Sequence, residues 1–285
     1  MLNNELKKCS KIIQNINTTN NIILCIPEFD IYDDKLLLWD KLLAKFGRKI
    51  ASQVMPECYK VPYDLKYFKK KYKNNNKYIM KKLYRGGKSG VHITKDYNEI
   101  INNFKNGPGI EKYSFDDYRT TGWEKLPFHL VQEYINNPLL IQGYKFNIRF
   151  FMIVTYVNNK LEYYLYKDAV LGYTENKFNY NSVKKIDNIT SLVINNRNST
   201  VKKLFQEYPY LLSQLNIHDK CIKQLKTKLL KIIDAYDISV KYNHTMFHIF
   251  GGDAEINNNK ELYIYELNQY PALQKYYSNS RRVLL

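Results

Sequence analysis

The sequence predicts an α+β protein, and three observations support this class. Strand-like segments with alternating apolar and polar residues recur along the chain, most clearly at 145–156. Helical patterns lie between them, above all the apolar stripe of 218–236. The 285 residues, 45% of them hydrophobic, suffice for a large core in one extended domain or in two lobes that meet at a cleft.

The individual elements follow from local patterns taken in chain order. Strands are expected where short apolar runs occur, at 22–26, 78–80, 91–94, 130–135, 145–156 and 161–166. Helices are expected where apolar residues recur at helical spacing, at 36–46, at the basic segment 63–72 and at 218–236. Gly47 should end the first of these helices, and Asn158-Asn159 should form the turn between the two long strands. Residues 95–125 should be irregular and partly helical.

Composition limits the function classes. The 44 Lys+Arg against 27 Asp+Glu give a net charge of +17, which favours an acidic partner: nucleic acid, anionic lipid, nucleotide or acidic polypeptide. The basic residues are spread along the chain, as on an ordinary solvated face, and no nucleic-acid recognition motif occurs, so nucleic-acid binding is the weakest hypothesis. We expect no membrane span and no signal peptide. Four cysteines without metal-finger spacing indicate free thiols and a cytoplasmic protein.

Near the C-terminus, two apolar runs flank the polar turn 257–260. A hairpin that pairs Ile256 with Glu261 places Asp253 on the same sheet face as Glu266 and Asn268. Two carboxylates and one amide carbonyl form a hard-oxygen set that suits Mg²⁺ or Mn²⁺ held together with phosphates. The alternative is that these side chains simply face water.

Basic residues that could meet such a metal–phosphate group occur upstream. Alternation along 145–150 puts Lys145, Asn147 and Arg149 on one face of a strand. Lys81 precedes the loop 85–90, whose glycines would let backbone N–H groups and lysines approach phosphate oxygens. The spacing differs from that of a Walker motif, so an ordinary hairpin loop is the alternative.

Together, these motifs resemble the tubulin–tyrosine ligase-like family of the ATP-grasp superfamily. The resemblance rests on Q-x-Y-I at 132–135, P-L-L-I-x-G-x-K-F-x-I-R at 138–149, D-x(12)-E-x-N-x-x-P-x-L at 253–273 and the segment 55–64. It covers about residues 50–275. It implies an ATP-grasp fold with two α/β lobes around an ATP cleft and a small N-terminal subdomain. We expect the subdomain at 1–50, the first lobe at 51–130 and the second at 131–285.

The resemblance also implies an activity and its residues. The protein would be an ATP-dependent ligase that adds glutamate, glycine or tyrosine to a protein acceptor, such as an acidic tubulin tail, through an acyl phosphate. The implied catalytic residues are Arg149 and Lys145, and the implied metal ligands are Asp253, Glu266 and Asn268. The implied nucleotide-binding residues are Lys81, Gly87, Lys88, Gln132, Glu133, Tyr134, Ile135, Lys145 and Asn147.

Several positions depart from the family pattern. Asn147 stands in place of the usual aspartate, Lys82 in place of proline, and Lys88 in place of the first loop glycine. Other changes fall on the acceptor side, at Gly172, Asn188 and Ser191. The alternative to an active ligase is therefore a catalytically impaired ATP-grasp protein that binds nucleotide or an acidic partner without ligating.

Overall fold

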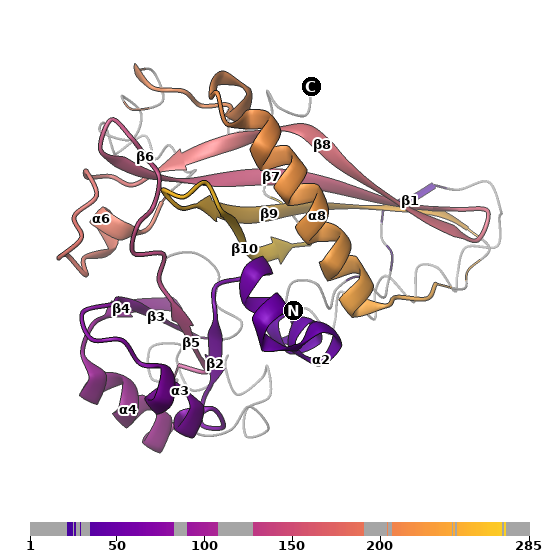
Figure 1. Cartoon of the computed structure of the whole chain (residues 1–285). Coiled ribbons are helices and arrows are strands. Elements are labelled where there is room, and N and C mark those ends of the chain that lie inside the picture. Colours follow the sequence, from indigo (N-terminus) through magenta and orange to yellow (C-terminus); the bar gives the residue numbers. More distant parts are fainter. Residues whose placement is uncertain are drawn as a thin grey trace, which may run out of the picture.

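Two β-sheets and the helices packed on them make up the part of the chain that the structure describes (Figure 1). The structure is a computed structural model, and it describes residues 22–24, 26, 29, 35–82, 90–107, 128–190, 204, 207–240, 242, 244–269 and 271. The predicted loop residues Gly87 and Lys88, as well as Ser191, lie outside these ranges. Cys58 and Cys221 are free thiols, as predicted, and both are buried.

The larger sheet has six strands, in the order β1-β9-β7-β6 with β10 on β9 and β8 on β7. Its strands are β1 (Ile22–Leu24), β6 (Leu140–Ile141), β7 (Tyr144–Val157), β8 (Lys160–Tyr173), β9 (Thr245–Ile256) and β10 (Leu262–Asn268). All its pairs are antiparallel except β1 with β9. Asn158 and Asn159 both adopt positive φ, so the predicted turn between β7 and β8 is confirmed.

The smaller sheet has four antiparallel strands in the order β2-β5-β3-β4. Its strands are β2 (Cys58–Lys60), β3 (Tyr78–Lys81), β4 (Val91–Thr94) and β5 (Leu130–Glu133). Two helices, α3 (Leu65–Lys71) and α4 (Tyr97–Asn106), pack on it. Phe68 of α3 and Phe104 of α4 form an aromatic core with Tyr59 and Tyr78 of the sheet. The Asp96 side chain accepts hydrogen bonds from the backbone at the start of α4 and caps it, and this helix agrees with the expectation that residues 95–125 are partly helical.

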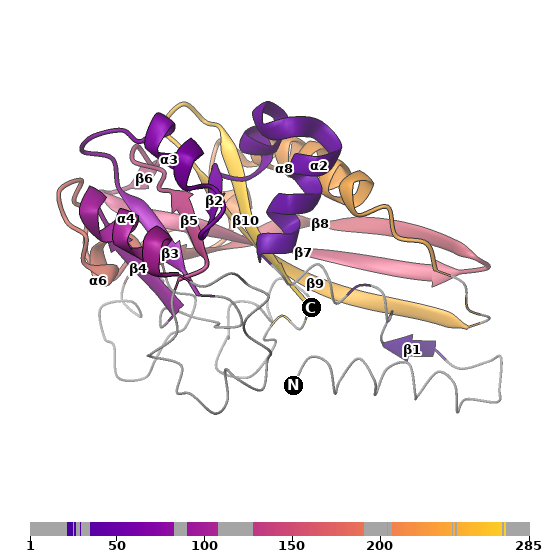
Figure 2. The same ribbon diagram turned by 90° about the horizontal axis from the view of Figure 1, so that it is seen from below.

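Two long helices, α2 (Lys35–Val54) and α8 (His218–Tyr236), lie side by side on one face of the larger sheet (Figures 1 and 2). Two shorter helical segments are α6 (Lys185–Asn188) and η4 (Leu212–Gln214). The apolar stripe predicted for α8 is buried against the sheet, at Leu225, Leu229 and Ile232. This interleaving of helices and strands confirms the predicted α+β class. In the described residues, no helix is long and apolar enough to cross a membrane.

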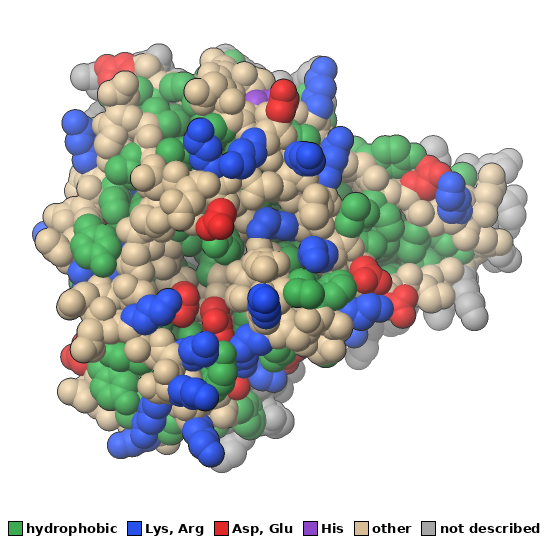
Figure 3. Space-filling model, viewed as in Figure 1, with side chains coloured by type: hydrophobic (Ala, Val, Ile, Leu, Met, Phe, Trp, Pro, Cys, Tyr) green, Lys and Arg blue, Asp and Glu red, His purple; other side chains and the backbone are tan. Residues whose placement is uncertain are grey.

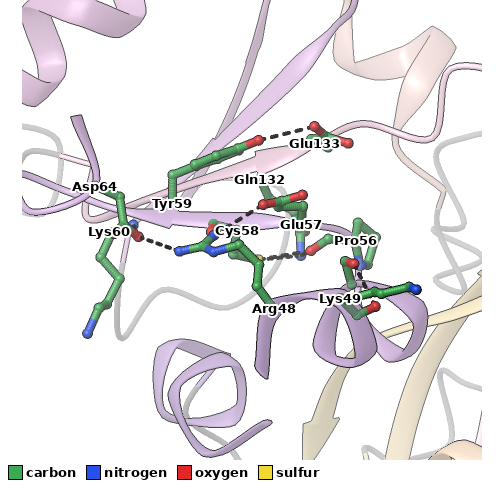
Figure 4. A network of polar contacts seen from close by, with 11 residues as sticks. Arg48, Lys49, Pro56, Glu57, Cys58, Tyr59, Lys60, Asp64, Gln132 and Glu133 are labelled. Atoms are coloured by element: carbon green, nitrogen blue, oxygen red, sulfur yellow. Dashed lines mark hydrogen bonds and ion pairs between the residues drawn. The ribbon is translucent and has the colours of Figure 1, made fainter. Parts of the chain in front are cut away.

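The prediction that Gly47 ends the first helix is confirmed, because the backbone of Gly47 is not helical and α2 consists of two helical segments that meet there, the second of which runs to Val54. Gly47 has φ 74° and produces a kink, which a glycine tolerates without steric cost. Beyond the kink, Arg48 reaches the smaller sheet, where its Nη1 atom lies 3.2 Å from Glu57 Oε1 and 3.1 Å from the carbonyl oxygen of Cys58 (Figure 4). Its guanidinium lies 4.1 Å from the ring centroid of Tyr67. Helix α2 therefore contacts both sheets.

The predicted register of the C-terminal hairpin, by contrast, is wrong by one residue. Ile256 pairs with Leu262 instead of Glu261. A slip of one residue would turn Glu266 to the opposite face of the sheet, because side chains alternate along a strand. The register shifts again between Ile264 and Glu266, at a β-bulge, and this extra residue brings Glu266 back opposite Asp253.

Candidate active site

Three charged residues stand in a row across neighbouring strands of the larger sheet. Arg149 of β7 pairs with Asp253 of β9, and Asp253 pairs with Glu266 of β10. Residues paired in this way project to the same face. The opposite face of these strands carries the core under α2 and α8, which includes Ile148 and Ala254. The row therefore lies on the sheet face opposite this core.

Arg149 and Asp253 form a bidentate ion pair. Nε of Arg149 lies 2.8 Å from Oδ1 of Asp253, and Nη2 lies 2.8 Å from Oδ2. The side-chain amide of Asn147, two residues earlier on β7, donates to the same Oδ1 over 3.2 Å. Gly172 of β8 pairs with Asn147 on its other side, so an arginine at position 172 would stand beside this group. The strand alternation predicted for this segment is thus confirmed.

Two adjacent glycines make room for this arrangement. A Cβ atom on Gly251 would lie 3.1 Å from Nη1 of Arg149 and 2.8 Å from Cβ of Pro271. A Cβ atom on Gly252 would lie 2.0 Å from Cζ of Phe150, on the core side. The sequence Gly-Gly before Asp253 therefore lets the arginine lie across β9 on one face and the Phe150 ring pack under it on the other.

Glu266 is held by cations. Its Oε2 atom lies 2.8 Å from Nζ of Lys35, and its Oε1 atom accepts a hydrogen bond from the Asn268 amide over 3.3 Å. Burial alone would raise the pKa of Glu266, but Lys35 and Lys81 outweigh it and lower the pKa to about 2. At Asp253, by contrast, burial and the neighbouring Glu266 carboxylate raise the pKa against the opposing charge of Arg149. Glu266 therefore stays ionised over a wide pH range.

Lys145 belongs to a second, fully buried group. Its Nζ atom lies 2.9 Å from Oε2 of Glu255 and donates to the Tyr134 hydroxyl over 2.9 Å. The Tyr265 hydroxyl donates to the same Glu255 oxygen over 2.8 Å. Burial raises the pKa of Glu255, and Lys145 opposes that shift. Because Tyr134 follows strand β5, this group links the larger sheet to the smaller one.

Lys81 of β3 brings the smaller sheet close to the row. It is 8% exposed, and its Nζ atom lies 5.2 Å from the ring centroid of Tyr265 on β10. Burial lowers the pKa of Lys81, while Glu266 acts in the opposite direction. The structure thus brings Lys81, from the first half of the chain, next to carboxylates from the last forty residues.

The predicted adenine-binding segment 132–135 begins within β5 and extends beyond its end, and most of its side chains are engaged within the protein. Gln132 is buried and donates to the carbonyl oxygen of Pro56 and to Sγ of Cys58, so its side chain points into the smaller sheet (Figure 4). Glu133 accepts a hydrogen bond from the Tyr59 hydroxyl over 3.1 Å, and burial raises its pKa. Ile135 is buried. Nucleotide recognition here would therefore fall to the backbone.

A further lysine joins the smaller sheet to the segment that follows β8. Lys77, immediately before β3, is fully buried and donates to Oδ1 of Asn188 over 2.6 Å. Its ammonium lies 4.5 Å from the ring centroids of both Tyr134 and Phe178. Burial lowers the pKa of Lys77 to about 7, and the nearby Lys145 adds to this effect. Asn188, one of the positions that depart from the family pattern, thus has a structural partner.

The donor set around Asp253 and Glu266 fits a divalent cation. The two carboxylates lie opposite each other on paired strands, and the amide of Asn268 follows on β10. The side-chain amide oxygen Oδ1 of Asn147 is buried beside Asp253 and has no hydrogen-bond partner among the described residues. Oxygen donors of this kind suit Mg²⁺. No cluster of three or more His, Cys, Asp or Glu side chains suited to a metal ion occurs in the described ranges, so the set depends on its amides.

Three polar residues of this region escaped the sequence prediction. Glu255 carried a usable signal, because it lies two residues after Asp253 and so on the same face of an otherwise apolar strand. Lys35 and Lys77 carried no signal in the sequence. Each is one lysine among many in a basic chain, and only the tertiary packing of α2 and β3 selects it.

The two sheets, with lysines from one and carboxylates from the other at their junction, have the arrangement of an ATP-grasp fold, as predicted. A family model described as the tubulin-tyrosine ligase family matches residues 21–284. The chain therefore belongs to the tubulin–tyrosine ligase family.

Named relatives fall into several activity groups. The chain is 27% identical to the probable tubulin polyglutamylase TTLL2 of Homo sapiens, over 56% of this chain and 28% of the relative. It is 24% identical to the tubulin monoglutamylase TTLL4 of Mus musculus, over 85% of this chain and 20% of the relative. It is 22% identical to the tubulin glycylase 3B of Drosophila melanogaster, over 70% and 26%. The chain thus spans less than a third of the length of these relatives.

Proposed function

We propose that this protein is an ATP-dependent ligase that joins an amino acid to a protein acceptor through an acyl-phosphate intermediate. The observation that carries the proposal is the row of Arg149, Asp253 and Glu266, with Lys81 facing it from the other sheet. Phosphoryl transfer requires positioning and charge neutralisation, and this arrangement offers cations and metal-binding carboxylates side by side.

In this proposal, Asp253, Glu266 and Asn268 hold Mg²⁺ or Mn²⁺, which would neutralise charge on the ATP phosphates. Lys81 and Lys145 contact phosphate oxygens. An ammonium group has three donors, and Lys145 uses two of them on Glu255 and Tyr134, which leaves the third for a ligand.

Arg149 then neutralises the carboxylate that is phosphorylated or the phosphoryl group in transfer. Asn147 contributes its side-chain oxygen Oδ1, which has no partner in the described part of the chain, beside the metal. The backbone of 132–135 holds the adenine, and the loop that contains Gly87 and Lys88 covers the phosphates.

The proposed acceptor is an acidic polypeptide such as a tubulin tail. The net charge of +17 favours encounter with such a chain. Lys and Arg side chains are distributed over the face that carries α2 and α8 (Figure 3), and Lys220, Lys223 and Lys226 of α8 are exposed there. Because the named relatives are glutamylases and a glycylase, glutamate and glycine are the first amino acids to test. A tubulin acceptor would place the activity in the cytoplasm.

Nucleotide binding is tested by thermal unfolding with Mg·ATP. We expect Mg·ATP to raise the melting temperature of the unaltered chain, because a ligand that binds only the folded state stabilises it. Glu266→Gln removes a metal-binding charge at almost constant volume and should abolish most of that increase. An unaltered chain that shows no increase at millimolar Mg·ATP would contradict the proposal.

A second function is a nucleotide-binding protein that does not ligate. The observation that favours it is the position of Asn188, whose side chain is occupied by Lys77 and the backbone of residues 182 and 184 and is not available to a substrate. Both functions predict the Mg·ATP effect, and only the ligase transfers an amino acid to an acceptor.

A further inference from the structure

Lys35 is the first residue of α2, and it contacts the proposed metal site directly. Its Nζ atom lies 2.8 Å from Oε2 of Glu266, and both side chains are 22% exposed. The start of the helix is fixed by Leu36, Leu38 and Trp39, which are buried in the core of the larger sheet. Helix α2 also lies against β10 (Figure 2). The packing of α2 therefore places the ammonium of Lys35 next to Glu266.

Both carboxylates of the row already form ion pairs with cationic side chains of this chain. Arg149 contacts both oxygens of Asp253, and Lys35 contacts one oxygen of Glu266. A divalent cation that binds the same carboxylates competes with Lys35 for the Glu266 oxygen. Two cations at such a short distance repel each other, so the ammonium and the metal cannot share the site without cost.

We infer that Lys35 is an internal counter-cation of the proposed metal site, which occupies Glu266 until a divalent cation displaces it. This inference rests on the proposed function, because it uses the metal ligands proposed there. Lys35 is better suited to leave than Arg149. It carries a single point charge on a flexible stem and is already partly in water, whereas Arg149 is bound at two atoms of one carboxylate.

The metal-binding test uses Mn²⁺ alone, without nucleotide, and measures free Mn²⁺ by electron paramagnetic resonance. Lys35→Met removes the competing charge and keeps the length of the side chain. We expect this variant to bind Mn²⁺ at least about fivefold more tightly than the unaltered chain, the lower end of typical coupling between two sites. The matched control is Lys45→Met on the same helix, whose pair with Asp234 is largely exposed, and it should leave Mn²⁺ affinity unchanged.

A double variant ties the effect to Glu266. If Lys35 acts through that carboxylate, Lys35→Met should have no effect on Mn²⁺ binding in a chain that already carries Glu266→Gln. A gain that persists in the double variant would overturn the inference, because Lys35 would then act elsewhere.

Thermal unfolding gives a second readout. Without metal, Lys35→Met leaves Glu266 beside Asp253 with less compensation, so its melting temperature should fall, and Mn²⁺ should raise it by more than it raises that of the unaltered chain. Equal or weaker Mn²⁺ binding by Lys35→Met, or no binding by either protein, would overturn the inference. The proposed function is judged separately, since it fails if the unaltered chain does not bind Mg·ATP or transfers no amino acid to an acceptor.

Discussion

The row formed by Arg149, Asp253 and Glu266 and the buried group formed by Lys145, Glu255 and Lys77 lie at the same junction of two sheets, but they are built differently. In the two ion pairs of the row, Lys35–Glu266 and Arg149–Asp253, each side chain is 15–22% exposed. The Lys145–Glu255 pair is only 3–4% exposed, and Lys77 is fully buried. A buried charge cannot lose its partner without a large desolvation cost, whereas a partly hydrated one can exchange partners. The difference indicates that the buried group holds the sheets together, with one Lys145 donor left for a ligand, whereas the charged groups of the row can exchange their partners for a ligand.

The largest expected effect falls on the buried pair. Glu255→Leu leaves Lys145 buried with only the Tyr134 hydroxyl, and the free energy of unfolding should fall by about 3–5 kcal/mol. Chemical denaturation measures this loss. The matched control is Glu255→Leu combined with Lys145→Met, which replaces both charges and should recover most of the stability. If the single variant lost less than about 1 kcal/mol of unfolding free energy, the buried pair would contribute no more than an exposed ion pair does, and the distinction between the two groups would be contradicted.

The next effect concerns the contact between Lys77 and Asn188. Asn188→Ala removes the acceptor at 2.6 Å and leaves a buried donor, which should cost about 1–3 kcal/mol of unfolding free energy. Asn188→Asp retains the acceptor for Lys77 but loses the two hydrogen bonds that the amide donates to the backbone of residues 182 and 184, so it should recover only part of the stability. Unfolding curves of the three proteins compare them directly, and an alanine variant as stable as the unaltered chain would show that Lys77 does not depend on this residue.

Lys77 should also make stability depend on pH. Its folded pKa is lowered to about 7 by burial, whereas an unfolded lysine titrates near 10.4, so the unfolded state binds more protons between these values. The destabilising effect of the lysine is fully present below pH 7 and is lost as pH rises toward the unfolded pKa. Within this window the free energy of unfolding of the unaltered chain should rise by up to about 1.4 kcal/mol per pH unit relative to that of Lys77→Met. The measurement is the unfolding free energy of the unaltered chain minus that of Lys77→Met, from about pH 6.5 to 9. A difference that stays constant or falls as pH rises would contradict the prediction.

The smallest effect on stability is expected in the row. Arg149→Lys keeps the positive charge and loses one of the two hydrogen bonds to Asp253, so the cost should be about 1 kcal/mol, the typical value of one hydrogen bond. Ligation should nevertheless fall by about 100-fold or more, the usual effect of removing a positioned donor at a reacting centre. A variant that is strongly destabilised but retains full ligation would reverse the roles assigned to the two groups.

The sequence predicted the elements better than the register between them. Strand β7, its turn at Asn158-Asn159 and helix α8 follow from local periodicity, and the structure confirms them. The pairing of Ile256 was predicted one residue out of register, because a polar turn does not define how many residues it contains. The bulge after Ile264 compensated for this, so Asp253 and Glu266 meet as predicted although the predicted pairing is wrong.

The parts of the candidate site that could not be predicted depend on long-range packing. Lys35 is separated from Glu266 by most of the chain, and its contact exists because the apolar stripe of α2 packs beside β10. Gly47 ends the first helical segment, as expected for glycine, but the sequence did not predict the second segment that follows it and buries Ala51 and Val54. Periodicity therefore identified which face of α2 is buried, and it did not indicate which end of the helix reaches the site.

The central claim is tested most directly by the intact mass of an acceptor protein. The full chain is incubated with Mg·ATP, tubulin and one amino acid at a time, and Asp253→Asn serves as the control with the metal site impaired. We predict a discrete mass increment of one or more residues of glutamate or glycine on tubulin with the unaltered chain, and none with Asp253→Asn. A chain that binds Mg·ATP but adds neither glutamate, glycine nor tyrosine would contradict the ligase and favour a nucleotide-binding protein without ligase activity.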